Sequence, residues 1–116
     1  MMWIVAGLGG RAFERDRPAE FAQREPLSIE PIMQRLAVAV HDADALIAGL
    51  SDDALTRSYE IQNYRVTGLE AVYHVVEHFA FHTGQIITMT KAIKDCDLSL
   101  YDAQGHRRDG RASGAP

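Results

Sequence analysis

Cysteine is almost missing from this chain, which has one, Cys96, among its 116 residues. No disulfide can form within one chain, so a small secreted scaffold held by disulfides is excluded and we expect a cytoplasmic location. Long apolar runs are missing as well, since nothing approaches the roughly 18 consecutive apolar residues of a membrane-spanning helix. We therefore expect no contact with the membrane interior.

Positive charge is also scarce. The chain has 12 Lys and Arg residues against 16 Asp and Glu residues, a net charge of −4. No basic stripe with interleaved aromatic residues occurs, and such a stripe is the usual mark of a protein that binds nucleic acid. We expect no nucleic-acid partner. A chain of this length forms one domain.

Hydrophobic periodicity predicts two long helices. The first begins after a capping residue, Ser28, and ends before Gly49. Its apolar face consists of Ile32, Leu36, Ala39, Ala43, Leu46 and Ile47. The second begins at the capping-box pattern of residues 67–70, in which a hydroxyl and a carboxylate satisfy backbone donors reciprocally. Its helical period continues to about Lys94.

Shorter elements lie before and between these helices. Residues 1–8 have the character of a helix end, because Gly9 and Gly10 follow them directly. Residues 11–27 predict a long connection with one short turn at 19–23.

A capped single turn is expected at residues 51–57, and a small extended excursion follows at 58–66. Asn63 suits a turn within it. The polar, glycine-rich residues 104–116 predict a disordered tail after a helical domain of residues 1–103.

Three histidines, His74, His78 and His82, are spaced four residues apart on the second long helix. A step of four residues returns a side chain to nearly the same face, one turn higher. Two such imidazoles can share one metal ion, because neutral ring nitrogens bind zinc, nickel, copper or iron at roughly 2.0–2.1 Å. We expect the rings to converge in the interior of a bundle, with a third ligand from another element.

The segment His78-Phe-Ala-Phe-His82-Thr-Gly-Gln-Ile-Ile resembles the last-helix signature of the DinB-like superfamily of four-helix bundles. The resemblance extends to Trp3-Ile-Val-Ala-Gly-Leu-Gly-Gly10, to Arg15-Asp-Arg-Pro-Ala-Glu-Phe21 and to Tyr73-His-Val-Val-Glu-His78. Together these segments look like the DUF1572 branch of that superfamily, and the likeness covers most of the chain.

This resemblance implies a divalent metal ion, zinc or nickel, held by a histidine triad. Its last-helix ligands match His78 and His82, and the remaining histidine would precede Trp3 in the second helix of the bundle. His74, Gln85 and Glu77 are then candidates to orient a ligand ring or a bound water, or to serve as an alternative ligand.

By the same resemblance, the first helix of the bundle and part of the second lie outside this chain. We therefore expect an all-α, DinB-like bundle that is incomplete in one chain and is completed in a homodimer.

Two function classes remain open. In the first, the chain is a metal-dependent enzyme of the thiol transferase or hydrolase type, with a small-molecule thiol as substrate. In the second, it is a non-catalytic oligomerisation module with an incomplete inherited metal site. The sequence does not identify the catalytic residues.

Overall fold

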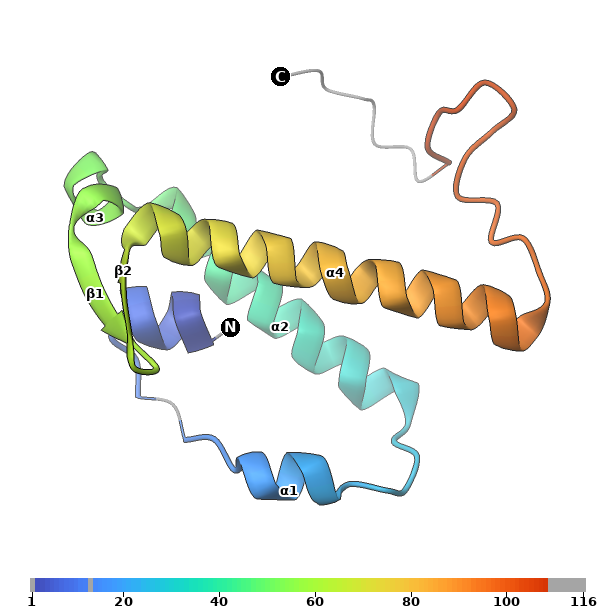
Figure 1. Ribbon diagram of the computed structural model, residues 1–116, viewed down its shortest axis with the longest axis horizontal. Coiled ribbons are helices and arrows are strands. Elements are labelled where there is room, and N and C mark those ends of the chain that lie inside the picture. Colours follow the sequence, from blue (N-terminus) through green and yellow to red (C-terminus); the bar gives the residue numbers. More distant parts are fainter. Residues whose placement is uncertain (1, 13, 109–116) are drawn as a thin grey trace. The chain divides into compact units, whose positions relative to one another are not determined.

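The computed structural model describes residues 2–12 and 14–108, and they are mostly helical. In chain order the elements are η1 (Met2–Leu8), α1 (Arg17–Ala22), α2 (Ile29–Ala48), α3 (Asp52–Thr56), β1 (Ser58–Ile61), β2 (Tyr64–Thr67) and α4 (Gly68–Lys94) (Figure 1). The chain divides into two compact units, unit 1 up to His78 and unit 2 from Phe79. The helical class is confirmed, with one β-hairpin added to the predicted all-α fold.

The first element, η1, is a π-helix rather than an α-helix. It ends where Gly10 adopts a left-handed conformation with a φ of 65°. The Gly10 amide donates to the Ala6 carbonyl at 2.9 Å, and the Arg11 amide donates to the Val5 carbonyl at 3.3 Å. Each bond spans one residue more than the corresponding bond of the Schellman motif that ends many α-helices, as the wider π turn requires. The predicted helix end is confirmed.

The connection after η1 contains the short helix α1, where a turn was predicted. Its first turn includes Pro18, and the Asp16 carboxylate accepts from the Ala19 amide at 3.0 Å. The long helix α2 begins after Ser28 and ends at Gly49, as predicted, but the Ser28 side chain makes no capping hydrogen bond. The predicted position of the cap is confirmed, but the capping hydrogen bond of Ser28 is not formed.

The hairpin follows the capped turn of α3, in which the Ser51 hydroxyl accepts from the Ala54 amide at 3.2 Å. Strands β1 and β2 pair in antiparallel register, with Ser58 opposite Thr67 and Ile61 opposite Tyr64. The two loop residues, 62 and 63, have φ values of 51° and 70°. Positive φ at both positions is typical of the type I′ turn that two-residue hairpin loops favour. The predicted extended excursion, with its turn at Asn63, is confirmed.

The start of α4 is a complete capping box. The Thr67 amide donates to the Glu70 carboxylate at 2.7 Å, and the Glu70 amide donates to the Thr67 hydroxyl at 3.2 Å. Gly68 lies between them because a Cβ there would clash with the backbone of α3, including the Leu55 Cα at 3.0 Å. The helix runs to Lys94, which confirms its predicted length.

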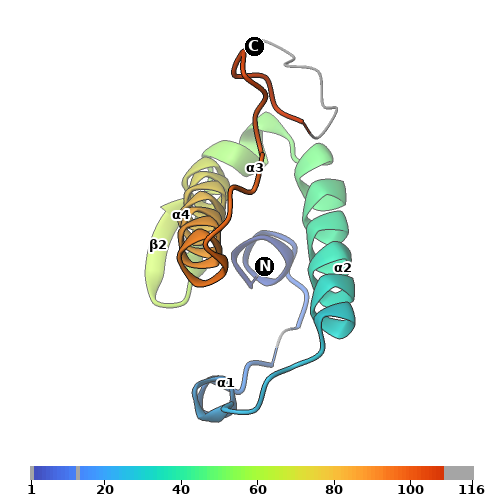
Figure 2. The ribbon, with the colours of Figure 1, turned by 90° about the vertical axis from the view of Figure 1, so that its right-hand side faces the viewer.

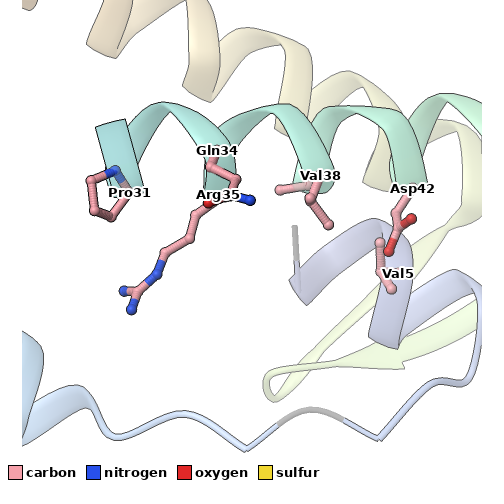
Figure 3. A pocket seen from close by; sticks show the side chains of 7 residues that line it. Val5, Pro31, Gln34, Arg35, Val38 and Asp42 are labelled. Atoms are coloured by element: carbon pink, nitrogen blue, oxygen red, sulfur yellow. The ribbon is translucent and has the colours of Figure 1, made fainter. Parts of the chain in front are cut away.

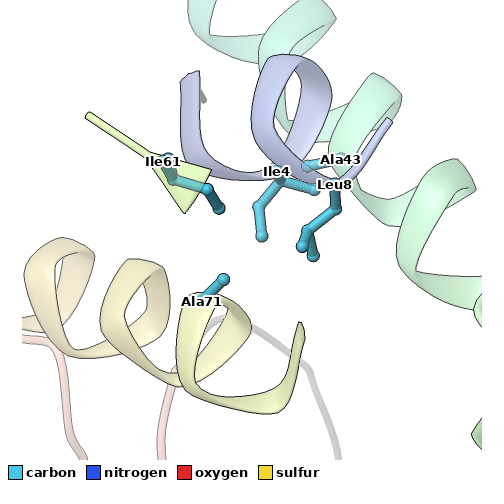
Figure 4. Close-up of a cluster of buried hydrophobic side chains, with 5 residues drawn as sticks. All are labelled: Ile4, Leu8, Ala43, Ile61 and Ala71. Carbon is cyan, nitrogen blue, oxygen red and sulfur yellow. The ribbon is translucent and has the colours of Figure 1, made fainter. Parts of the chain in front are cut away.

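A small core holds unit 1 together. Its buried side chains come from η1, α2, β1 and α4 and are Ile4, Leu8, Ala43, Ile61 and Ala71 (Figure 4). The helix η1 packs against both α2 and β1, and it lies beside α2 in both ribbon views (Figures 1 and 2). Burying a side chain the size of Ile4 stabilises the fold by about 1.5–3 kcal/mol. This core fixes the first turns of α4.

Unit 2 contains the rest of α4 and a short closed loop. The Asp102 side chain accepts from the backbone amides of Gln104 and His106, and an isolated bridge joins Tyr101 to Arg107. The pKa of Asp102 is lowered, chiefly by the hydrogen bond from the His106 amide. Of the tail predicted to be disordered, residues 109–116 lie outside the described part of the chain, so that expectation stays a prediction.

No helix between residues 2 and 108, apart from the undescribed residue 13, is long and apolar enough to cross a bilayer.

Candidate metal centre

All three sequence-predicted histidines lie on α4, which the capping box and the buried Ala71 hold in place. His74 and His78 belong to unit 1, whereas His82 belongs to unit 2. Each of the three side chains is exposed. None of the three lies in a bundle interior within the single chain, and the expectation of such an interior in a homodimer stays a prediction.

In unit 1, two imidazoles lie in a short row with aromatic rings. The His74 and His78 ring centroids are 5.8 Å apart with an interplanar angle of 30°. On its other side His74 contacts Trp3 of η1, with centroids 4.3 Å apart. Trp3 also contacts Tyr64 of β2 at 5.8 Å, and its indole N–H donates to Gln62 at 3.4 Å. This row connects three elements at one edge of unit 1.

In unit 2, Gln85 orients the ring of His82. The His82 Nδ1 is 2.9 Å from the Gln85 Oε1. With the Gln85 amide oriented in this way, the hydrogen bond forms when Nδ1 carries the proton, and Nε2 is then the ring nitrogen with the lone pair. Metal-binding histidines commonly donate their other ring N–H to a neighbouring acceptor, and the role expected of Gln85 in orienting a ligand ring stays a prediction.

Glu77 does not approach the ring pair as a third ligand. It lines a shallow groove of about 530 Å³ together with Leu69, Glu70, Tyr73 and His74. The Glu70 carboxylate is already bound to Thr67, whose amide and then hydroxyl lower the pKa of Glu70. Glu77 has no hydrogen-bonding or ionic partner among the described residues. The groove beside His74 is therefore acidic.

The donor set is short of the three ligands that the resemblance implies. Within residues 2–12 and 14–108, no three His, Cys, Asp or Glu side chains come close enough together to hold a metal ion. The described residues fit a metal ion only through pairs of imidazoles.

A second hollow, of about 590 Å³, is lined by Val5 of η1 and by residues of α2, and none of the three histidines lines it (Figure 3). Its lining is mostly apolar, with Arg35 and Asp42 at its edge, and Asp42 is paired with Arg11 at 3.0 Å. None of these residues was a predicted site residue. The involvement of Trp3 with His74 was also missed, because nothing in the sequence indicates a contact across about 70 positions.

The matching family model describes the DinB superfamily and covers residues 1–86. The chain belongs to the DinB superfamily. The matched range includes all three histidines of α4 and Gln85, so the resemblance based on the His78–Ile87 segment is confirmed at superfamily level. Comparisons with curated proteins and with solved structures gave no match. Assignment to the DUF1572 branch and the missing helices stay predictions.

Proposed function

We propose that this DinB superfamily chain binds a divalent transition metal ion, zinc or nickel, through His78 and His82. The observation that carries the proposal is the hydrogen bond of 2.9 Å between the His82 Nδ1 and Gln85. When Nδ1 carries the proton of this bond, the lone pair lies on Nε2, which is the nitrogen that would bind the ion. A ligand held in this way costs little ordering when the ion binds.

The spacing of the two histidines supports the same ligand pair. Both belong to one helix, α4, and they are four residues apart. Side chains at this spacing occupy one face of an α-helix, which suits two adjacent coordination positions on one ion. The family signature, the helix and the Gln85 hydrogen bond thus favour the same two residues.

We propose further that the activity is of the metal-dependent thiol transferase or hydrolase type, with a small-molecule thiol as substrate. The support is membership of the superfamily together with the exposure of the histidines, which leaves them accessible to a small molecule. The single cysteine favours a cytoplasmic location, where such thiols are kept reduced.

The test is the metal content of tag-free protein after zinc or nickel is added and excess ion is removed. We expect bound ion in the parent and its loss in the double variant His78→Ala, His82→Ala. The variant Gln85→Ala should keep the site but lower its affinity about 10–100-fold, since Gln85 acts only on the ring orientation. A parent that binds no ion would reject the proposal.

A second candidate function, an oligomerisation module, is favoured by the apolar stripe of α2. The part of this stripe near Ala43 is buried, but the same face continues toward the start of the helix uncovered. Its five residues there, 38–60% exposed, are Ile29, Ile32, Met33, Leu36 and Val40. An apolar helix face of this length usually packs against another helix, so we propose a homodimer formed along it.

Size-exclusion chromatography with light scattering tests the homodimer. We expect the parent to be a dimer at micromolar concentration and Leu36→Glu to be a monomer. Val38→Glu is the matched control, because Val38 is exposed on the opposite side of the same helix and should leave the dimer intact. A monomeric parent would contradict this second function.

A further inference from the structure

We infer that His74 and His78 form a separate two-nitrogen site for a divalent transition metal ion, with Trp3 as its neighbour and reporter. This inference goes beyond the proposed function, because it needs neither His82 nor Gln85. It shares only His78 with the ligand pair proposed above. The contacts that support it all lie within unit 1.

The distance between the two rings carries the inference. Their centroids are 5.8 Å apart. When two imidazoles bind one tetrahedral ion through nitrogens at roughly 2.0–2.1 Å, their ring centroids lie on the order of 5 Å apart. The observed separation is within side-chain adjustment of that value.

Trp3 restricts the His74 ring before any ion binds. The two rings are 4.3 Å apart and tilted by 38°, and the indole is itself held by Tyr64 and by its bond to Gln62. A side chain that is already ordered loses less conformational entropy when it binds a ligand. The His74–His78 pair is therefore better organised than two exposed histidines on a bare helix.

The surrounding charge favours a cation. Glu77 and Glu70 line the groove that His74 also lines. Clustered carboxylates raise the local concentration of cations. Imidazole nitrogens select zinc, copper and nickel, whereas magnesium and calcium require oxygen ligands. The two-nitrogen site should therefore bind copper(II) more tightly than nickel(II) or zinc(II), and it should not bind magnesium.

One ion cannot use all three histidines of α4. Residues eight positions apart on an α-helix are separated by about 12 Å along the axis, so His74 and His82 cannot meet at a single ion. His78 serves one pair or the other. Separate substitutions of His74 and His82 consequently distinguish the two sites.

The experiment is titration of tag-free protein with copper(II) or nickel(II), followed by fluorescence of Trp3, the only tryptophan. A paramagnetic ion bound beside the indole quenches its emission. We expect saturable quenching at one ion per chain in the parent and in His82→Ala. His74→Ala and His78→Ala should lose the quenching or require at least about tenfold more ion, since losing only an outer partner of a ligand costs that much.

His41→Ala is the matched control, because His41 is another exposed histidine but lies on α2, and its quenching should equal that of the parent. Calorimetry of Trp3→Phe should still detect binding of the ion. This variant therefore shows whether the ion binds without the tryptophan whose fluorescence is measured. Unchanged quenching in His74→Ala would overturn the inference. Quenching lost in His82→Ala and kept in His74→Ala would also overturn it, while leaving the proposed function standing.

Discussion

Units 1 and 2 differ in where their side chains find contacts. All five buried hydrophobic residues of the described chain lie in unit 1, and they come from four different elements. Residues 79–108 of unit 2 include none that is buried. One helix, α4, contributes to both, so the same type of backbone is fixed by tertiary packing in one unit and by local bonds in the other.

In the helical part of unit 2, side-chain hydrogen bonds join residues three or four positions apart. The hydroxyls of Thr83 and Thr90 donate to the carbonyls four residues earlier, at 2.7 Å each. His82 is held by Gln85, three residues along. In unit 1, by contrast, His74 is held by Trp3 from a distant part of the chain. The His74 ring is thus ordered by a contact that requires the fold of unit 1, whereas the hydrogen bond of His82 to Gln85 lies within α4.

The largest expected difference between the units concerns stability. Ile61→Ala should lower the free energy of unfolding by about 2–5 kcal/mol, because Ile61 is only 4% exposed and its loss leaves a cavity. Ile86→Ala, the same substitution at a site that is 65% exposed in unit 2, should cost less than about 0.5 kcal/mol. Urea unfolding followed by circular dichroism measures both. Equal costs would show that the two units do not differ as described.

A smaller effect is expected at the helix cap. Thr67→Ala should cost about 1 kcal/mol, because it removes the hydroxyl that accepts from the Glu70 amide. Thr83→Ala is the control in unit 2. Its hydroxyl bonds only a carbonyl that the helix already uses, and alanine has the better helix propensity, so its effect should be near zero. A cap variant as stable as the parent would contradict the role of the capping box.

The smallest expected effect is a pH dependence at the same cap. Hydrogen bonds from the Thr67 amide and hydroxyl lower the pKa of Glu70 from its ordinary value near 4.5. Since the folded pKa is the lower one, the stabilisation is complete above about pH 4.5 and is lost as pH falls through the folded pKa. In Glu70→Gln, the stability curve should be flatter at acid pH. An unchanged acid limb would show that Glu70 contributes nothing there.

The local structure was largely predictable from the sequence, because its signals are short. The capping box at residues 67–70, the glycine end of η1 and the turn at Asn63 each depend on a few neighbouring residues whose chemistry limits the backbone. The family was predictable for a similar reason, since the signature around His78 and His82 is contiguous.

The arrangement of the site was less predictable, because it depends on contacts between distant residues. Trp3 packs on His74, and periodicity carries no information about such a pair. The exposure of the histidines was not foreseen either, since an amphipathic pattern shows which face is apolar but not whether another element covers it. The Ser28 cap shows the same limit locally, because a suitable residue does not guarantee its bond.

The most direct test of the account is calorimetric titration of zinc or nickel into tag-free parent protein and into the single variant His78→Ala, the one residue common to both proposed ligand pairs. We expect stoichiometric binding by the parent and at least about a tenfold loss of affinity in the variant. Binding that is equally tight in His78→Ala, or no binding by the parent, would contradict the claim that α4 carries a metal site.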